Sequence, residues 1–367
     1  MEREDNKIKA IVAMSGGVDS SVAAALLKKA GYDVVGVFMH FWMEDKGCAS
    51  GSEQAARAVA NKLKIPFQVL DVRRVFKKEV VDYFLSEQRR SRTPNPCVVC
   101  NKKIKFGVFL KKALGPPAGG KADCVATGHY VKIKQDDNIV YKIFAAKDET
   151  KDQSYFLHQL NQRQLSKVIF PLGEYTKEEV KKMAKLWHLP CQKEQSFDLC
   201  FIKGEPAGFI KKYLKLKTGD VVEYQKNKKA DSVRLGRHEG LPLYTIGQRK
   251  NILVGQGLPA GRQGPWWVIK KDEKKNILYI SNNEKDLYSR ELIVEKVNWL
   301  GGIALKLPIK ALVKIRYKSE AGEARVSQIA NRKLRVDFKK AQRAITPGQS
   351  AVFYSEKGEL LGGGVIK

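Results

Sequence analysis

Residues 8–30 read IKAIVAMSGGVDSSVAAALLKKA and carry the clearest structural signal in the chain. An apolar run at 8–14 ends at Ser15-Gly16-Gly17, and residues 20–30 then show helical periodicity up to Gly31. This order predicts a buried strand, a glycine loop and a helix. Glycines let backbone N–H groups approach phosphate oxygens, and the helix N-terminus adds partial positive charge. We therefore expect a phosphate-binding loop here.

The alternation of strand and helix continues downstream. Apolar runs at 34–41 and 67–70 flank a helix-like stretch at 52–63, and a further run at 124–127 ends at Gly128-His129-Tyr130. This alternation predicts an α/β fold with a doubly wound parallel sheet. Ligands bind at the carboxyl ends of the strands in such sheets. We therefore expect the segment after residue 127 to lie at the ligand edge.

The glycine loop lacks the lysine that follows the glycines of a γ-phosphate-gripping P-loop. Its serine hydroxyls are expected to add donors for phosphate, and Asp19 to orient the loop or help hold Mg²⁺. The SGGxDS pattern resembles the PP-loop of ATP pyrophosphatases, enzymes that adenylate a substrate and release pyrophosphate. The alternative is a serine N-cap on an ordinary helix.

A chain of 367 residues exceeds what one hydrophobic core usually organises. Helical signals fade after about residue 208, where short strands punctuated by glycine and proline take over. We predict a catalytic domain at 1–208, a small central domain at 209–272 and a C-terminal β-barrel domain at 273–367. Alternating runs at 278–280, 309–317, 324–329, 333–338 and 350–354 are assigned to that barrel, with a sandwich as the alternative.

The charge balance of the chain indicates a polyanionic partner. Lysine and arginine number 68 against 39 acidic residues, so the net charge is 68 − 39 = +29. Part of this charge, such as that of Lys226, Lys228 and Lys229, is expected to serve solubility alone. No apolar run approaches the roughly 20 residues that cross a bilayer, and the start is polar. We expect a cytoplasmic protein with no membrane partner.

Six cysteines are present: Cys48, Cys97, Cys100, Cys124, Cys191 and Cys200. In a reducing compartment, paired thiols usually perform chemistry or hold metal. The stretch TPNPCVVCNK at 93–102 places two thiols three residues apart, after prolines that impose a rigid, non-helical entry and beside basic residues that favour thiolate. With Cys200 as a second site, one thiol can carry a persulfide and the other can cleave it.

Other assignments of the cysteines remain open at this point. Buried, inert thiols are the favoured interpretation for Cys48, Cys124 and Cys191. A zinc site normally uses four ligands, often as two close pairs, and only one C-x-x-C occurs.

Taken in order, several fragments of the sequence resemble a known family. They are AMSGGVDSS, TPNPCVVCNKKIKF, ATGHYVKI, KDQSYFL, LCFI, GRHEGLPLYTIGQRK, PGQSAVFY and LGGGVI. Together they resemble the bacterial tRNA-specific 2-thiouridylases, which modify the wobble uridine. The resemblance implies an adenine nucleotide alpha hydrolase-like PP-loop domain, a tRNA substrate, ATP with Mg²⁺, and a persulfide donor, either a cysteine desulfurase or a sulfur relay protein.

The resemblance also assigns roles to residues of this chain. Cys100 is implied as the nucleophile and Cys200 as the persulfide carrier, with a Cys100–Cys200 disulfide left after sulfur transfer. The implied ATP contacts are Ala13, Met14, Ser15, Gly16, Gly17, Val18, Asp19, Ser20, Met39 and Gly128. The implied target-base segment is Asn95, Pro96 and Cys97. The implied tRNA contacts are His129, Lys151, Asp152, Gln153, Arg316, Tyr317 and Gln349.

One position departs from the family pattern. Many relatives carry aspartate where this chain has Cys97, and a thiol does not simply replace a carboxylate in proton transfer. Either the acid–base role lies elsewhere or it is not essential. A second possibility is that Cys97, Cys100 and Cys200 ligate a [4Fe–4S] cluster whose open iron binds sulfide. The stretch Gly261-Arg262-Gln263-Gly264 looks like an insertion and receives no function.

Several residues and functions have competing interpretations. His129 is either a packed histidine or, as we favour, a tRNA contact, whereas Trp266-Trp267 are expected in the core rather than stacked on bases. Arg89, Arg90 and Arg92 are interpreted as phosphate contacts rather than a solvated face. The competing functions are a PP-loop ligase acting on a small molecule and an RNA-binding module with a vestigial nucleotide loop.

Overall fold

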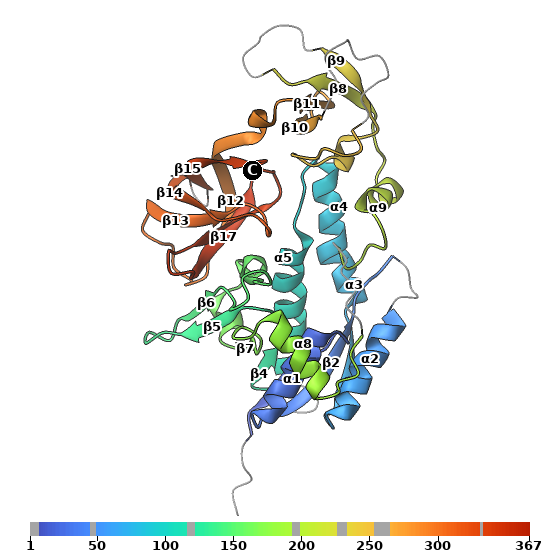
Figure 1. Cartoon of the computed structure of the whole chain (residues 1–367), viewed down its shortest axis with the longest axis vertical. Coiled ribbons are helices and arrows are strands. Elements are labelled where there is room, and N and C mark those ends of the chain that lie inside the picture. Colours follow the sequence, from blue (N-terminus) through green and yellow to red (C-terminus); the bar gives the residue numbers. More distant parts are fainter. Residues whose placement is uncertain are drawn as a thin grey trace, which may run out of the picture.

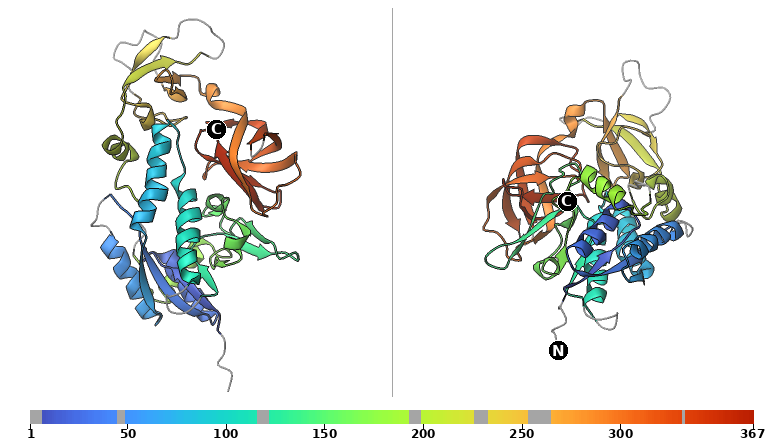
Figure 2. Two further views of the ribbon diagram at one scale, coloured as in Figure 1. Left: turned by 180° about the vertical axis from the view of Figure 1, so that it is seen from behind. Right: turned by 60° about the horizontal axis from the view of Figure 1, so that its bottom comes forward.

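The computed structural model describes residues 7–44, 49–115, 122–192, 199–225, 233–252, 265–330 and 333–367. Three parts are visible in Figure 1: an α/β domain, a small sheet at the opposite end of the molecule, and a barrel at the side. The helices labelled α4 and α5 run between these parts. Figure 2 shows the same arrangement from behind and from below.

The first domain contains a five-stranded sheet in the order β3-β2-β1-β4-β7, in which every pair is parallel. Its strands are β1 (Lys9–Ala13), β2 (Asp33–His40), β3 (Phe67–Asp71), β4 (Cys124–Ala126) and β7 (Val168–Ile169). The chain proceeds from β1 towards β3 on one side and later adds β4 and β7 on the other. The strand order therefore reverses at β1 and β4, which confirms the predicted doubly wound sheet and marks the position where ligands bind.

Alternate residues of β1 pack against helices on opposite faces of this sheet. Ala10 and Val12 join a core with α1 (Val18–Lys29) and α2 (Ala49–Lys62), whereas Ile11 joins the larger core on the other face. The helices that supply the larger core are α3 (Arg73–Phe76), α4 (Asp82–Arg89), α5 (Pro96–Cys100) and α6 (Leu110–Leu114). This burial on both faces explains why the strands are continuous apolar runs.

Two long helical segments cross the middle of the molecule. In the first, the π-helical turn η1 (Lys77–Val81) joins α3 to α4, and in the second, η2 (Asn101–Phe109) joins α5 to α6. The rest of this domain is built from β5 (Lys132–Gln135), β6 (Tyr141–Phe144), η3 (Ser154–Leu157), α7 (Gln162–Leu165), α8 (Lys177–Leu186) and α9 (Pro206–Tyr213). The sequence periodicity did not predict the π-helical turns.

The central sheet has the order β10-β11-β8-β9. Its elements are β8 (Gly219–Glu223), β9 (Arg234–His238), η4 (Leu241–Leu243), β10 (Trp267–Asp272) and β11 (Ile277–Ser281). Because β10 and β11 form an antiparallel pair and β11 also pairs with β8, the predicted boundary at 272/273 cuts through this sheet. Assigning the run at 278–280 to the barrel was therefore wrong. Trp266 is buried in this core, as expected.

The last domain is a closed barrel in the order β12-β15-β14-β13-β16-β17. It is formed by η5 (Glu284–Leu287), β12 (Tyr288–Trp299), β13 (Ile309–Lys314), β14 (Gly322–Ala330), β15 (Lys333–Arg343), β16 (Ser350–Tyr354) and β17 (Leu360–Ile366). Alternate residues such as Val294, Val313 and Val336 fill its interior. This confirms the barrel over the sandwich.

Some sequence predictions fall outside the described residues. These are the interpretations of Cys48, of Lys226, Lys228 and Lys229, and of the stretch 261–264. Within the described ranges, no helix combines the length and the apolar composition that crossing a bilayer requires.

Candidate functional site

The loop between β1 and α1 has the geometry of an anion site. Gly16 has φ +80°, and a Cβ there would lie 2.4 Å from the carbonyl oxygen of Ser52 in α2, so only glycine fits. Gly17 caps α1 without any side-chain hydrogen bond. The first N–H groups of α1 are therefore left to bind an anion, and the helix dipole favours negative charge there.

The serine hydroxyls of this loop serve its own backbone. Ser20 and Ser21 donate to the carbonyl oxygen of Gly17 at 3.1 and 2.9 Å, and Ser20 Oγ accepts from the Ser15 N–H at 3.0 Å. Both side chains are buried. In this state they hold the loop in shape, and backbone N–H groups rather than these hydroxyls are the donors that an anion would meet.

Asp19 is held by a cation that sequence analysis did not identify. The ammonium of Lys177, at the start of α8, lies 2.7 and 2.9 Å from the two carboxylate oxygens, and Tyr130 donates to Asp19 at 2.7 Å. Lys177 is far from the glycine motif in sequence, so only the packing of α8 against α1 reveals it. The tertiary fold thus supplies the positive charge that the motif lacks.

Gly128 and Met39 lie at the carboxyl ends of β4 and β2. A Cβ on Gly128 would lie 2.8 Å from the backbone of Asp19 and Ser20, so its absence lets β4 approach the start of α1. Met39 is buried in the core on the α3–α6 side of the sheet. The structure therefore brings Gly128 directly to the loop, whereas the Met39 side chain packs in the interior.

Cys97 and Cys100 lie on the first turn of a helix. Residues 92–95 are non-helical, as the prolines predicted, and α5 begins with Pro96 at its first helical position. Cys100 is buried in the main core, and Cys97 is half-buried. The i, i+3 spacing puts both thiols on one face of the helix.

Burial raises the pKa of both thiols, that of Cys100 to about 11. The expectation that basic neighbours favour thiolate is wrong for this state, because desolvation is the largest influence on both pKa values. Lys102 instead donates to Gln159, and Lys103 pairs with Glu79. Lys105 alone among these lysines lowers the pKa of Cys97 and Cys100.

Cys200 belongs to the same site although it comes from a distant part of the chain. It is exposed, yet desolvation by the surrounding protein raises its pKa to about 12, and repulsion from the ionised forms of Cys100 and Cys97 adds to this. Lys105 acts on this thiol as well, in the opposite direction. Lys105 thus lowers the pKa of all three thiols, whereas Cys124 is a buried strand residue, as expected.

The three thiols do not form a preassembled metal site. Across the described ranges, no three His, Cys, Asp or Glu side chains are grouped so that they would hold a metal ion. The arrangement therefore does not fit a cluster bound by Cys97, Cys100 and Cys200 together.

Two of the expected tRNA contacts in the first domain are buried. His129 hydrogen-bonds Thr127 at 2.7 Å and packs against Phe106 and Phe170, and burial lowers its pKa far below the usual value. The preference for a tRNA contact over a packed histidine is corrected here, because the ring is in the interior. Asp152 is also buried and accepts from Ser154 Oγ at 2.7 Å.

The neighbours of Asp152 differ in exposure. Lys151 is exposed, and Gln153 is half-buried with its side-chain oxygen accepting from the Tyr130 N–H at 3.0 Å. Of these three expected contacts, only Lys151 has an exposed side chain.

The expected tRNA contacts in the barrel lie at the junction between domains. Arg316 donates to the carbonyl oxygens of Ile246 and Ala344, both at 2.9 Å. Tyr317 packs against Phe156 with ring centroids 4.4 Å apart and the ring planes tilted by 41°. Gln349 donates to the carbonyl oxygen of Thr93 at 2.9 Å. These three side chains therefore join the barrel to the other two domains.

The arginines before the cysteine helix separate into two groups. Arg89 and Arg90 are exposed, whereas Arg92 is half-buried and donates to Glu87 at 2.8 Å. Arg90 also pairs with the Glu87 carboxylate at 3.6 Å, and Arg92 helps to fix the end of α4.

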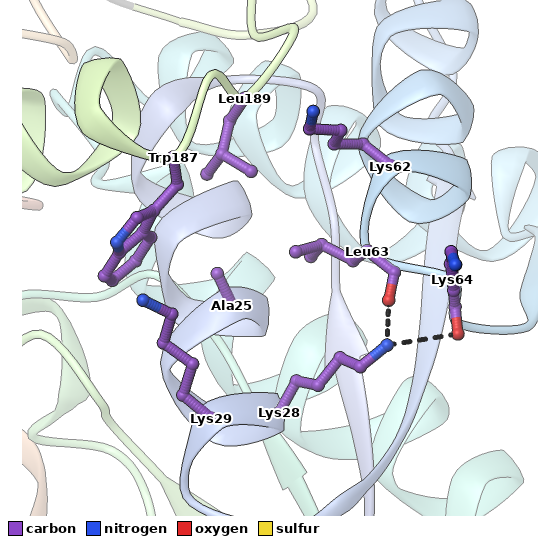
Figure 3. A pocket seen from close by; sticks show the side chains of 8 residues that line it. All are labelled: Ala25, Lys28, Lys29, Lys62, Leu63, Lys64, Trp187 and Leu189. Carbon is purple, nitrogen blue, oxygen red and sulfur yellow. Dashed lines mark hydrogen bonds between the residues drawn. The ribbon is translucent and has the colours of Figure 1, made fainter.

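A basic cavity of about 400 Å³ lies at the opposite end of α1 from the glycine loop. Figure 3 shows lysines around it, with Lys29 over the ring of Trp187 and Lys28 bonded to the carbonyl oxygens of Leu63 and Lys64. The C-terminal ends of α1, α2 and α8 converge there. Because those ends carry partial negative charge, the lysines are explained as their complement.

Sequence profiles of three domains match the chain. The tRNA methyl transferase HUP domain matches residues 8–204, the tRNA methyl transferase PRC-barrel domain residues 207–282, and the aminomethyltransferase beta-barrel domain residues 289–366. The middle match ends just after β11, in agreement with the pairing of that strand.

Full-length relatives match almost the whole chain. The tRNA-specific 2-thiouridylase MnmA of Legionella pneumophila (strain Lens) is 42% identical, over 98% of this chain and 99% of its own. That of Halothermothrix orenii is 41% identical over the same shares. That of Syntrophomonas wolfei subsp. wolfei is 42% identical over 98% of this chain and all of its own.

A solved structure shares part of the fold. The U34-tRNA thiolase NcsA from Methanococcus maripaludis with its [4Fe-4S] cluster is 21% identical, with a TM-score of 0.35, over 53% of this chain and 62% of its own. This likeness is too low to bear on function. The profile names mention methyl transfer, but the relatives that span the whole chain are named for thiolation, and the chain belongs to their family, the tRNA-specific 2-thiouridylases.

Proposed function

We propose that the chain is an ATP-dependent tRNA 2-thiouridylase that replaces the C2 oxygen of the wobble uridine with sulfur. Relatives that match 98% of it are named tRNA-specific 2-thiouridylases, which supports this proposal. The observation that carries the proposal is that Cys100 and Phe201, the residue after Cys200, are buried in the same core although they come from separate segments. Ionised Cys100 also raises the pKa of Cys200. They belong to the same domain as the anion-binding loop, so activation by ATP and sulfur transfer have one scaffold.

The first step is adenylation of the base. ATP binds along residues 13–20, and the uridine O2 attacks the α-phosphorus, so that an O–P bond forms and pyrophosphate leaves. Mg²⁺ accompanies the phosphates. Because both Asp19 oxygens already contact Lys177, no step is assigned to a bond between Asp19 and Mg²⁺. Lys177 contacts Asp19 of the loop and is the cation that we assign to a phosphate oxygen.

The second step is delivery of sulfur from Cys200. A persulfide donor protein, either a cysteine desulfurase or a sulfur relay protein, loads Cys200, whose exposure gives such a donor access. The terminal sulfur attacks C2 and AMP leaves. Cys100 then attacks the Cys200 sulfur, which breaks the S–S bond, leaves the sulfur on the base, and forms a Cys100–Cys200 disulfide that a reductant opens.

Protonation of the thiols sets the requirements of this step. Because burial raises the pKa of Cys100 to about 11, its proton must leave as it attacks. Lys105 favours the thiolate at all three positions. Cys97 has a raised pKa and is neutral near pH 7, so it does not reproduce the carboxylate found at this position in many relatives. Acid–base assistance is therefore assigned elsewhere.

The substrate contacts follow from the same arrangement. Asn95, Pro96 and Cys97 meet the target base, and exposed Lys151 contacts tRNA phosphate. Arg316, Tyr317 and Gln349 contact tRNA only at the domain junction, where they are already engaged. The small-molecule ligase and the RNA-binding module remain the competing functions, and neither requires thiols on two segments.

The proposal is tested by reconstituting the reaction. Anaerobically purified protein, ATP, Mg²⁺, a persulfide or sulfide source and unmodified tRNA are combined, and 2-thiouridine is measured by nucleoside mass spectrometry. Wild type is compared with Cys100→Ala, Cys200→Ala and Cys97→Ala, with Cys124→Ala as the control for a thiol outside the site. We expect product in wild type and Cys124→Ala, loss with Cys100 and Cys200, and product with Cys97.

Two other results would change the assignment. Loss in all three site variants, in proportion to bound iron, would favour the [4Fe–4S] route, which the arrangement of the described thiols does not fit. Absence of thiolated nucleoside under every condition would leave an ATP-using enzyme of unassigned substrate.

A further inference from the structure

Both accessory domains contact the segment that leads to the two thiols. This segment, residues 91–95, connects α4 to α5. Its beginning is tied to α4, because the Arg92 N–H donates to the Glu87 carbonyl oxygen at 3.0 Å and the Arg92 guanidinium donates to the Glu87 carboxylate at 2.8 Å. The remaining anchors come from far along the chain.

The barrel forms hydrogen bonds with both backbone polar groups of Thr93, its N–H and its carbonyl oxygen. The Thr93 N–H donates to the Pro347 carbonyl oxygen at 2.9 Å, and Gln349 Nε2 donates to the Thr93 carbonyl oxygen at 2.9 Å. Gly348 lies between these two partners with φ +93°, and a Cβ there would come within 3.0 Å of Thr93 backbone atoms. Only glycine permits this approach, so the barrel loop is shaped to receive Thr93.

The central domain forms a hydrogen bond with the side chain of Thr93. Its hydroxyl lies 3.2 Å from that of Thr245. The residue after Thr245, Ile246, accepts from Arg316 of the barrel at 2.9 Å, and the same guanidinium nitrogen donates to Thr346 Oγ1 at 2.6 Å. Arg316 therefore also joins the central loop that carries Thr245 to the barrel loop that precedes Pro347.

Little freedom remains between Thr93 and the first thiol. Pro94 and Pro96 fix their own φ angles and restrict the residue before each. Asn95, between them, acts on the pKa of Tyr155, and the Tyr155 hydroxyl donates to the Ser350 carbonyl oxygen at 3.0 Å. A shift of Thr93 is therefore transmitted to Cys97 rather than absorbed.

We propose that Thr93 is a positioning residue, held by Thr245 and by residues 347–349, through which the central domain and the barrel set the position of Cys97 and Cys100. We call this set of residues the Thr93 joint. The accessory domains then align the thiols in addition to binding tRNA. Gln349 belongs both to the joint and to the proposed tRNA surface.

The first test measures thiol geometry without tRNA or ATP. Diamide, which takes up the two electrons and two protons, drives Cys100–Cys200 disulfide formation, and the linked peptides are quantified by mass spectrometry. Thr93→Val replaces the side-chain hydroxyl with a methyl group of similar size. We expect it to slow this disulfide by about 3- to 10-fold, the effect of losing one neutral hydrogen bond. Thr93→Ser, which keeps the hydroxyl, is expected to restore the rate.

Further variants separate positioning from general stability. Thr245→Val is expected to match Thr93→Val, and the double variant to be no slower than either, because both remove the same contact. Gly348→Ala displaces the barrel loop and is expected to slow the disulfide with the hydroxyls intact. Thr218→Val changes an exposed threonine of the central domain outside the joint and serves as the matched control.

The second test uses the reaction and so rests on the proposed function. At saturating tRNA, Thr93→Val is expected to lower kcat by the same factor as the disulfide rate while tRNA affinity is unchanged. An unchanged disulfide rate in both folded Thr93→Val and folded Gly348→Ala, checked by circular dichroism, would overturn the joint. A slowed disulfide with no thiolation even by wild type would support the joint and reject the proposed function.

Discussion

The thiols show how a residue's neighbours in space outweigh its neighbours in sequence. Cys100 is followed closely by three lysines, yet Lys102 and Lys103 bond to Gln159 and Glu79 instead. Only Lys105 lowers the Cys100 pKa, and desolvation outweighs it. The Cys100 thiol is therefore protonated near neutral pH. It reacts only after it loses its proton or when a persulfide is present.

This predicts a steep pH dependence for alkylation of Cys100. A folded pKa of about 11, above the unfolded value of ~8.5, means that the folded state holds this proton more firmly. The stability that results is present below pH ~8.5 and is lost as pH rises towards 11. Iodoacetamide labelling, followed by peptide mass spectrometry, should rise about tenfold per unit between pH 7 and 10. Urea-unfolded protein is the control and should level off near ~8.5; levelling below pH 9 in folded protein would contradict the raised pKa.

At the scale of elements, two helix starts organise the site. The start of α1 follows a loop that requires glycine at position 16, and the start of α5 follows prolines that prevent helix before residue 96. The glycine loop before α1 and the non-helical entry before α5 were predicted, because glycine and proline restrict the backbone locally. The helix that begins at Pro96 was not predicted. The π-helical turns after α3 and α5 were not predicted, since they depend on packing within the main core.

Gly16→Ala and Gly31→Ala form a matched pair for the loop. Both glycines have positive φ, but a Cβ on Gly16 meets the Ser52 backbone, whereas one on Gly31 meets nothing within 4 Å. Gly31→Ala should cost only the backbone strain, about 1 kcal/mol, and Gly16→Ala about 3 kcal/mol because α2 must also move. Urea unfolding measures these costs, and calorimetry should show that ATP binding is lost only in Gly16→Ala. Equal costs in the two variants would refute the steric argument.

At the scale of the whole molecule, all three domains contribute contacts to the segment that leads to the cysteines of α5. The barrel reaches the first domain through Gln349 and also through Tyr354, whose hydroxyl lies 3.0 Å from that of Ser154. These contacts join residues that are far apart in sequence. The domains therefore do more than hang together through linkers, because their arrangement helps to build the site. The net charge of +29 spans all three domains.

That charge predicts a strong salt dependence of tRNA binding. The log–log slope of affinity against salt should be roughly 0.7 to 0.9 per phosphate neutralised, so about six contacts would lower affinity roughly a thousandfold between 50 and 200 mM. Filter binding of unmodified tRNA measures the slope, and Cys100→Ser should give the same one because it removes no charge. A flat response would argue against a tRNA surface.

The amino-acid sequence by itself determined the features that depend on short segments. The parallel sheet, the glycine loop between β1 and α1, the proline entry to α5 and the barrel follow from periodicity and from glycine and proline, whose backbone restrictions are local. The fragments that resemble known thiouridylases also pointed to the correct family.

Only the tertiary structure decided how these segments meet. It placed β11 in the central sheet, buried His129 and brought Lys177 to Asp19. It also placed Lys105 where its charge lowers the pKa of Cys100. Each of these depends on burial or on partners far away in sequence. Desolvation and pairing of charges are properties of the space around a group, and a local pattern of residues does not contain them.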